Sequence, residues 1–262
     1  MLPPFVDASW LADHPEAVLA DVRSSAADPH EGARRYAAGH LPGAVFVDLD
    51  RWLAAPPSPA EGRHPLPDPE VFAEGMRRAG IGDDTLVVAY DDEANAYAAR
   101  LVWMLRVTGH RATLLDGGIT GWTGPLTTTV PEPRPAAFTA RPWPADELAG
   151  IDDLEGTLLL DARPAGRFRG EGETLDVRAG HVPGAVNVPC RENVGRDGFL
   201  LPDDDLRARF AVVDGPWVSS CGSGVTACQN LLVAEHLGLP QGRLYVGSYS
   251  QWSSTDRPVE TG

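Results

Sequence analysis

The sequence predicts an α/β protein of two similar domains, each built on a mainly parallel sheet flanked by helices. Two observations support this prediction: one heptapeptide pattern occurs twice, and short apolar runs alternate with helical patterns in both halves of the chain. The heptapeptide reads AGHLPGA at 38–44 and AGHVPGA at 179–185. We therefore predict domains at 1–125 and 144–262, joined at 126–143 by a linker rich in proline and threonine.

In the first half, the brief apolar runs at 18–23 and 86–91 are typical of buried strands. Residues 95–109 have the apolar spacing of a helix packed on a sheet, and Gly109 provides a C-terminal stop. Because strand and helix alternate, parallel pairing of the strands is favoured. The second half repeats this plan, with strands expected at 158–162, 216–220 and 242–246 and a helix expected at 225–238, where Gly238 is the stop.

The charge and cysteine content argue against several classes of function. Lys and Arg number 22 against 37 Asp and Glu, which gives a formal net charge of −15. This charge argues against a nucleic-acid or anionic-membrane partner, and no apolar run approaches the roughly 18 residues of a membrane span. Three cysteines are too few for a disulfide framework, and residues 1–17 lack a signal-peptide pattern. We therefore expect a cytoplasmic protein.

The two halves differ in length at one place. His40 and His181 are 141 residues apart, whereas Asp91 and Cys221 are 130 apart, so the first half carries 11 extra residues between these landmarks. The extra residues fall in a stretch that contains His64. From composition alone, a tolerated surface insertion is the simpler interpretation. The alternative is an arm that one domain extends to the other.

The strongest chemical signal is a cysteine loop at 219–229, which reads SSCGSGVTACQ. Cys221 follows a predicted strand, at the sheet edge where open α/β sheets bind their ligands. Gly222, Ser223 and Gly224 then lead into a helix. Such a curled loop directs several N–H groups at one point and stabilises an anion there. We therefore expect a nucleophilic thiolate at Cys221 rather than a structural cysteine.

Two kinds of reaction use a thiolate held in this way. Cysteine-dependent phosphatases place an arginine six residues after the cysteine to bind phosphate oxygens, but that position here is Ala227. The other reaction is sulfur transfer, in which the thiolate accepts a sulfane sulfur and holds it as a persulfide. The cysteine loop therefore favours sulfur transfer. The remaining cysteines, Cys190 and Cys228, are interpreted as core residues.

The paired AGH-x-PGA turns, the LDGG and GW landmarks and the loop CGSGVTA together resemble the tandem-domain rhodanese-like sulfurtransferases over nearly the whole chain. The loop is most similar to that of the 3-mercaptopyruvate sulfurtransferases, because thiosulfate sulfurtransferases typically carry basic residues in place of Gly222 and Ser223. The resemblance implies two rhodanese-like domains, of which the first is catalytically silent. Asp91 stands at the position equivalent to Cys221, and no glycine cradle surrounds it.

The resemblance also implies four catalytic residues. Cys221 is the nucleophile, while Ser223, His64 and Asp50 form a proton relay. When sulfur leaves 3-mercaptopyruvate, the remaining pyruvate enolate needs a proton. A histidine, whose pKa lies near neutrality, can supply that proton through the serine hydroxyl while the aspartate orients the imidazole ring.

Substrate-binding residues follow from the same resemblance. Arg167, in the run DARPAGRFRG, binds the substrate carboxylate. A second arginine is expected before the AGHVPGA turn, where EGETLDVRA offers Arg178 at a spacing that departs from the family pattern. The loop amides that surround the transferred sulfur are those of Gly222, Gly224, Val225 and Thr226.

These assignments predict an enzyme that moves a sulfane sulfur from 3-mercaptopyruvate to cyanide or a thiol, through a persulfide on Cys221, with release of pyruvate. The expected partners are a small anionic sulfur donor and a thiol or cyanide acceptor, for which a thioredoxin-like protein is one candidate. No metal or organic cofactor is expected. The alternatives are a thiosulfate:cyanide sulfurtransferase and a non-enzymatic sulfur carrier or redox sensor.

Overall fold

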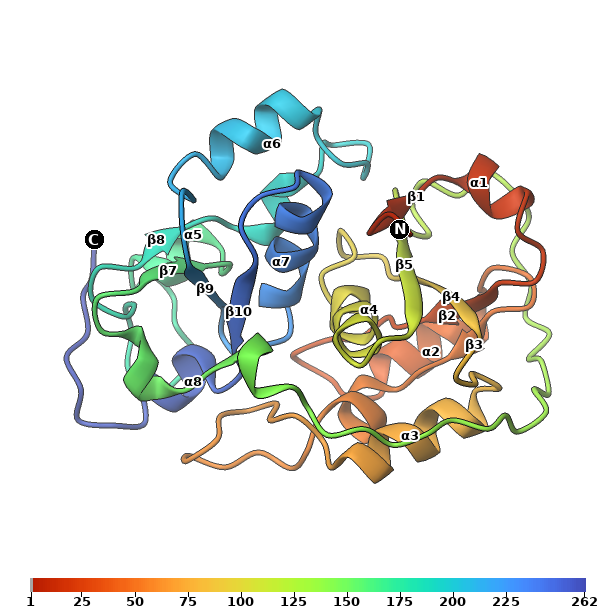
Figure 1. Cartoon of the computed structure of the whole chain (residues 1–262), viewed down its shortest axis with the longest axis horizontal. Helices are drawn as coiled ribbons and strands as arrows, with labels where there is room; N and C mark the ends of the chain where they lie inside the picture. The colour runs from red at the N-terminus through yellow and green to blue at the C-terminus, as the bar shows by residue number, and fades with distance from the viewer. Residues whose placement is uncertain (1) are drawn as a thin grey trace. The chain divides into compact units, whose positions relative to one another are not determined.

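Two five-stranded sheets, in which every strand pair is parallel, form the framework of the protein (Figure 1). The structure, a computed structural model, describes residues 2–262. Unit 1 consists of Met1–Ala55, Pro67–Trp143 and Val194–Leu200, and unit 2 of Pro56–Leu66, Pro144–Asn193 and Leu201–Gly262. The prediction of an α/β fold with two similar, mainly parallel domains is confirmed.

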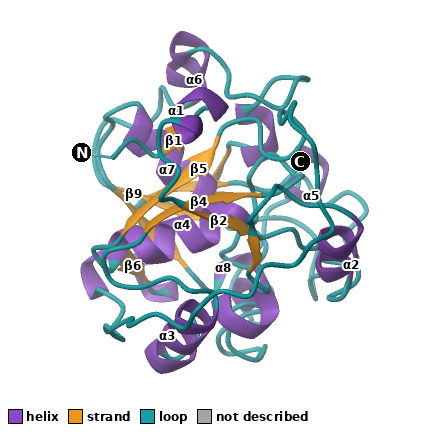
Figure 2. Ribbon diagram, turned by 90° about the vertical axis from the view of Figure 1, so that its right-hand side faces the viewer, coloured by secondary structure: helices purple, strands orange, loops and turns teal. Residues whose placement is uncertain are grey.

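Unit 1 has the strand order β1-β5-β4-β2-β3, and Figure 2 shows β5, β4 and β2 side by side. Its strands are β1 (Phe5–Val6), β2 (Val18–Asp21), β3 (Val45–Phe46), β4 (Leu86–Tyr90) and β5 (Arg111–Leu115). Its helices are α1 (Ala8–Ala12), α2 (Glu31–Ala38), α3 (Pro69–Arg78) and α4 (Ala98–Val107), with one π-helical turn, η1 (Leu49–Leu53).

Unit 2 repeats this order as β6-β10-β9-β7-β8, so each strand has a counterpart in unit 1. Its strands are β6 (Leu148–Ala149), β7 (Leu158–Asp161), β8 (Val186–Asn187), β9 (Trp217–Ser220) and β10 (Gly242–Tyr245). Its α-helices are α5 (Ala165–Phe168), α6 (Asp203–Arg209), α7 (Ala227–His236) and α8 (Ser248–Trp252). Three 3₁₀ turns are η2 (Ala145–Glu147), η3 (Ile151–Leu154) and η4 (Cys190–Asn193).

One helix of each unit lies inside the core. Residues 98–105 of α4 and 227–234 of α7 are all buried, which is the pattern of a helix enclosed on every side. Both helices end as predicted at a glycine in the left-handed region, Gly109 (φ +81°) and Gly238 (φ +66°). They begin two to three residues later than predicted, because the preceding residues form the loop after the strand.

The Asp-x-Arg pair and the AGH turn make the same contacts in both units. Arg23 Nη2 donates to the aspartate two residues before it (2.7 Å) and to the glycine carbonyl of the following AGH turn (2.8 Å). Arg163 Nη2 repeats both contacts, at 2.7 and 2.9 Å. These arginines are almost completely buried. Their shared role is therefore to join a strand end to a turn.

The boundary between the two units does not fall at one point in the sequence, and three connecting segments show this. The predicted linker at 126–143 contains no helix and contacts unit 1, where Thr139 N donates to Asp83 (2.8 Å). Pro56–Leu66, which covers part of the extra length of the first half, belongs to unit 2. Val194–Leu200, from the second half, belongs to unit 1, where Leu200 N donates to Asp116 (2.9 Å).

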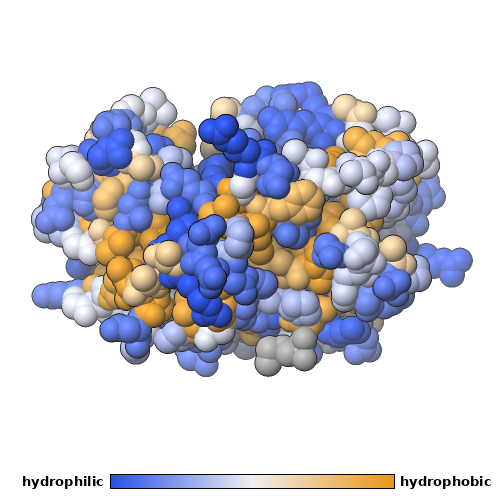
Figure 3. Space-filling view, turned by 90° about the horizontal axis from the view of Figure 1, so that it is seen from above, coloured by the Kyte–Doolittle hydropathy of each residue, from blue (hydrophilic) through white to orange (hydrophobic). Residues whose placement is uncertain are grey.

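The surface is mixed in character. Figure 3 shows a face on which hydrophilic side chains are interspersed with apolar patches. Within residues 2–262, no helix combines the length and the apolar character that crossing a bilayer requires.

Candidate active site

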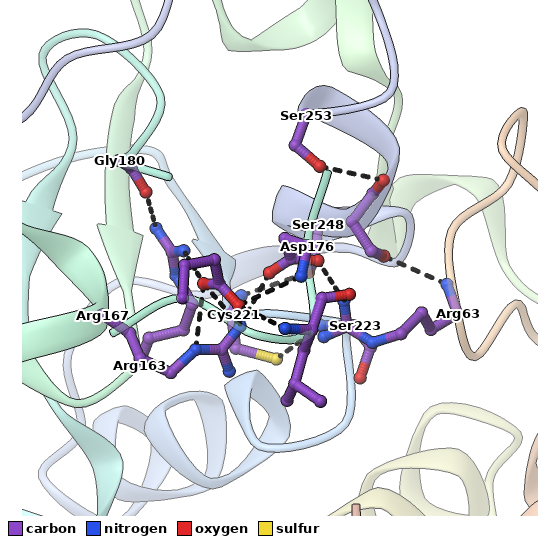
Figure 4. Close-up of polar contacts among 12 residues, drawn as sticks. Arg63, Arg163, Arg167, Asp176, Gly180, Cys221, Ser223, Ser248 and Ser253 are labelled. Carbon is purple, nitrogen blue, oxygen red and sulfur yellow. Dashed lines mark hydrogen bonds and ion pairs between the residues drawn. The ribbon is translucent and has the colours of Figure 1, made fainter. Parts of the chain in front are cut away.

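Cys221 lies directly after β9, at the start of the loop that leads into α7 (Figure 4). Its Sγ accepts hydrogen bonds from the amides of Ser223 (3.4 Å) and Gly224 (3.1 Å). The residue is only 2% exposed, yet these amides are directed at the sulfur rather than away from it. Two N–H donors near the N-terminus of a ten-residue helix stabilise a thiolate.

Glycine is required at position 224 for two reasons. Its φ of +75° lies in the left-handed region, where residues with a side chain are strained. A Cβ at this position would also lie 2.4 Å from the carbonyl oxygen of Val246. The amide that donates to the sulfur can therefore reach its position only if residue 224 is glycine.

Ser248 fixes the start of the loop from the other side. Its Oγ accepts a hydrogen bond from the amide of Cys221 (3.1 Å) and donates to the carbonyl of Tyr245 (2.8 Å). Its φ is +50°, and the equivalent residue of unit 1 is Gly118, with a φ of +53°. Unit 2 therefore keeps a strained serine where unit 1 has glycine, and the hydroxyl positions the amide of Cys221.

We expect the backbone strain at Ser248 to be measurable with two substitutions. Ser248→Ala and Ser248→Gly both remove the hydroxyl, but only glycine relieves the left-handed backbone. The glycine variant should therefore be more stable than the alanine variant by about 1 kcal/mol. Urea denaturation compares their free energies of unfolding. If the alanine variant were as stable as the glycine variant, the inference of backbone strain at Ser248 would be wrong.

His64 contacts the loop through Ser223. The distance from its Nδ1 to Ser223 Oγ is 2.8 Å. The neighbouring Arg63 donates from its amide to Ser250 Oγ (3.0 Å). Hydrogen bonds thus hold the segment 56–66 against the rest of unit 2 beside the cysteine loop. The segment places His64 next to the hydroxyl of Ser223.

Two arginines and two carboxylates lie next to the loop. We call Arg63, Arg167, Glu173 and Asp176 the charged cluster. Arg167 donates to both oxygens of Glu173 (2.9–3.1 Å) and to Asp176 (2.7 Å). Arg63 Nη1 donates to the other oxygen of Asp176. Figure 4 shows the two arginines on either side of Asp176.

The environment changes the pKa of both carboxylates. Burial raises the pKa of Asp176, and the charges of Arg63 and Arg167 act in the opposite direction. Glu173 is also buried, but hydrogen bonds from the Leu175 amide and from Arg167 lower its pKa. Buried carboxylates of this kind are stabilised by paired guanidinium groups.

The family follows from a comparison with known domains. A model of the rhodanese-like domain matches the chain twice, at residues 7–125 and 144–255. The chain belongs to the rhodanese family.

Comparison with individual relatives indicates which activity this rhodanese has. A probable 3-mercaptopyruvate sulfurtransferase of Pseudomonas aeruginosa is 43% identical over 266 residues, which cover 95% of this chain and 93% of the relative. The structure of 3-mercaptopyruvate sulfurtransferase from Leishmania major superposes with a TM-score of 0.86 at 33% identity, covering 98% of this chain and 75% of that chain. The thiosulfate sulfurtransferase of Bos taurus is 33% identical over 272 residues, covering 94% and 91% of the two chains. This rhodanese is therefore a sulfurtransferase enzyme rather than a non-enzymatic module.

Most of the predicted site residues of this rhodanese are in unit 2. They are His64, Arg167, Arg178, Cys221, Gly222, Ser223, Gly224, Val225 and Thr226. Val225 and Thr226 form the first turn before α7, where their carbonyls accept the amides of Cys228 and Gln229 (both 3.2 Å). Asp50 lies in η1 of unit 1, and its part in the relay stays a prediction.

The side chain of Arg178 contacts the C-terminal end of α8. Its Nε and Nη2 donate to the carbonyls of Ser253 (3.0 Å) and Trp252 (3.2 Å), so its guanidinium is used to cap that helix. Arg63 was not among the predicted site residues. Its position directly before His64 in GRHPLP is the signal that could have identified it.

The loop of unit 1 has an amide cradle of its own. Asp91, the equivalent of Cys221, accepts four main-chain N–H groups at 2.7–2.8 Å. An amide cradle therefore exists without glycines, because Ala94 (φ +62°) and Asn95 (φ +57°) adopt the left-handed backbone. Burial raises the pKa of Asp91 to about 6, opposed by these amide hydrogen bonds. The cradle is occupied by the protein's own carboxylate.

The other two thiols lie away from the start of the cysteine loop, Cys190 in η4 and Cys228 in α7. Within residues 2–262, Cys190 and Cys228 are buried and form no disulfide, and Cys228 donates to the carbonyl of Gly224 (3.5 Å). Among residues 2–262, no group of three or more His, Cys, Asp and Glu side chains is placed to hold a metal ion.

Proposed function

We propose that this rhodanese takes sulfur from 3-mercaptopyruvate, holds it as a persulfide on Cys221, and passes it to cyanide or a thiol with release of pyruvate. The observation that carries the proposal is the pair of amides directed at Cys221 Sγ, with His64 hydrogen-bonded to Ser223 beside them. A leaving enolate needs a proton on carbon, whereas sulfite leaving thiosulfate does not. The histidine contact therefore favours mercaptopyruvate as the donor.

In the first half-reaction, the Cys221 thiolate attacks the sulfur of 3-mercaptopyruvate. A sulfur–sulfur bond forms, the carbon–sulfur bond of the donor breaks, and its electron pair remains on the pyruvate enolate. The outer sulfur first keeps the S–H proton of the donor, and the loss of this proton replaces the one that His64 gives to the enolate. The persulfide is then anionic, and the amides of Gly222 to Thr226 stabilise its outer sulfur. Arg167 holds the carboxylate of the donor through the whole step.

The enolate is then protonated at its methylene carbon. His64 supplies this proton through the hydroxyl of Ser223, which lies 2.8 Å from Nδ1. Asp50 orients the imidazole ring, as the third member of a catalytic triad does. Pyruvate leaves, and the persulfide remains on Cys221.

In the second half-reaction, cyanide or a thiolate attacks the outer sulfur of the persulfide. The sulfur–sulfur bond breaks and the Cys221 thiolate is restored. The products are thiocyanate or a new persulfide on the acceptor. We infer a reducing, cytoplasmic setting from the cysteine content, and a thioredoxin-like protein is a candidate acceptor there.

Thiosulfate is the alternative donor, because guanidinium groups close to the sulfur also suit a dianion. Steady-state kinetics with both donors and cyanide as the common acceptor decides between them. We expect kcat/KM to be higher for 3-mercaptopyruvate. A higher value for thiosulfate would reverse the choice of donor and would support the alternative function.

Removal of the histidine is expected to affect the two donors differently. His64→Ala should slow pyruvate formation from 3-mercaptopyruvate roughly 100-fold, because the enolate loses its proton source. Thiosulfate turnover should change far less. Ser223→Ala should reproduce this selectivity, and the double variant should lose little more than either single variant. Equal losses with both donors would remove the relay from the mechanism.

A further inference from the structure

Two guanidinium groups converge on the main chain of Gly222, the residue after Cys221. A Cβ at Gly222 would lie 2.7 Å from Arg63 Nη2 and 3.4 Å from Arg167 Nη1. Within residues 2–262, all side-chain hydrogen bonds of these arginines are made by other nitrogens. Each group therefore has an unused N–H donor beside the reactive cysteine, in space that any side chain at position 222 would fill.

The carboxylates of the charged cluster orient both arginines. Asp176 contacts Arg63 with one oxygen and Arg167 with the other, and its side chain is 0% exposed. Glu173 accepts three hydrogen bonds from Nε and Nη2 of Arg167, and its side chain is 3% exposed. The arginines are 27% and 23% exposed. The negative charges are thus buried, while part of each positive group remains open to an incoming anion.

The segment after Arg167 does not supply the second cation that the resemblance implies. Arg178 is used at the end of α8. Arg169 is paired with Glu171 on the surface. Among the residues that the structure describes near Gly222, Arg63 is the second guanidinium, and it comes from the segment 56–66.

We propose that Arg63 is a substrate-binding residue that holds the donor carboxylate together with Arg167, and that Asp176 is the positioning residue for both. This inference rests on the proposed function and names the chemical class of the donor more closely. The cluster combines two positive and two negative charges, so it is neutral without substrate. A monocarboxylate adds one uncompensated charge and a dianion adds two, and the cluster therefore selects the monocarboxylate.

Alkylation of Cys221 tests Arg63 without any sulfur transfer. Iodoacetate and iodoacetamide react at the same carbon, but only iodoacetate carries a carboxylate. The ratio of the two alkylation rates, iodoacetate over iodoacetamide, should fall at least about fivefold in Arg63→Met. Arg63→Lys keeps the charge and should retain part of the ratio. The matched control is Arg169→Met, which removes a surface charge and should leave the ratio unchanged.

The iodoacetamide rate also reports whether the cysteine loop is intact in each variant. An unchanged ratio in Arg63→Met, or an equal fall in Arg169→Met, would overturn the assignment. With 3-mercaptopyruvate, Arg63→Met should raise KM at least about tenfold and change kcat much less. If the wild-type enzyme does not turn over 3-mercaptopyruvate, the proposed function fails, while the alkylation ratio still decides the role of Arg63.

Discussion

Replacement of Cys221 by serine is expected to abolish sulfur transfer. The serine hydroxyl can accept the amides of Ser223 and Gly224 that now donate to the sulfur. It is not ionised at neutral pH, however, and it cannot carry a sulfane sulfur. We therefore expect turnover to fall by at least about 1,000-fold with either donor.

Intact-mass spectrometry makes this prediction specific. After incubation with 3-mercaptopyruvate and no acceptor, the wild-type chain should gain about 32 Da, one sulfur atom. Cys221→Ser should gain nothing. The matched control is Cys190→Ser, which changes a buried thiol outside the cysteine loop and should keep the gain. A persulfide on the Cys221→Ser chain would show that another cysteine carries the sulfur.

Much of the fold could be predicted because its signals are local. The repeated AGH turns and the strand–helix alternation identify two α/β units, and Gly109 and Gly238 end their helices as expected. The cysteine loop could be predicted for the same reason. A strand end, two glycines and a helix start are adjacent in sequence, and together they determine where the amides near Cys221 lie.

The part of the site that could not be predicted depends on long-range contacts. Arg63 and Asp176 are 113 residues apart, and no local pattern tells which unit the segment 56–66 joins. Arg178 was the cation expected before the AGHVPGA turn, but its guanidinium donates to the carbonyls at the end of α8. A guanidinium can reach several acceptors, so spacing along the chain does not decide which one it contacts.

The loop around Asp91 shows a second limit of pattern reasoning. Glycines are the usual sign of an amide cradle, because glycine adopts positive φ without strain. Asparagine also tolerates this conformation, and an aspartate side chain readily accepts N–H groups from the residues that follow it. Asn95 and the carboxylate of Asp91 were therefore a signal that could have been used.

Replacement of Asp91 by alanine is expected to destabilise the protein by about 3 kcal/mol, because buried N–H groups lose a charged acceptor. The carboxylate is 1% exposed and satisfies the amides of Glu93, Asn95, Tyr97 and Ala98. Urea denaturation followed by circular dichroism measures the loss. Asp84→Ala, an exposed aspartate of the same unit, is the matched control and should change stability by less than about 0.5 kcal/mol.

This comparison separates two explanations for the amide cradle of unit 1. If Asp91 satisfies the cradle, its replacement lowers stability much more than the replacement of Asp84, and the carboxylate is an internal anion that stabilises the loop of unit 1. If both variants lose the same small amount, water or a solute anion replaces the carboxylate without penalty. The cradle would then not depend on Asp91, and its geometry would be determined by the backbone of residues 92–98 alone.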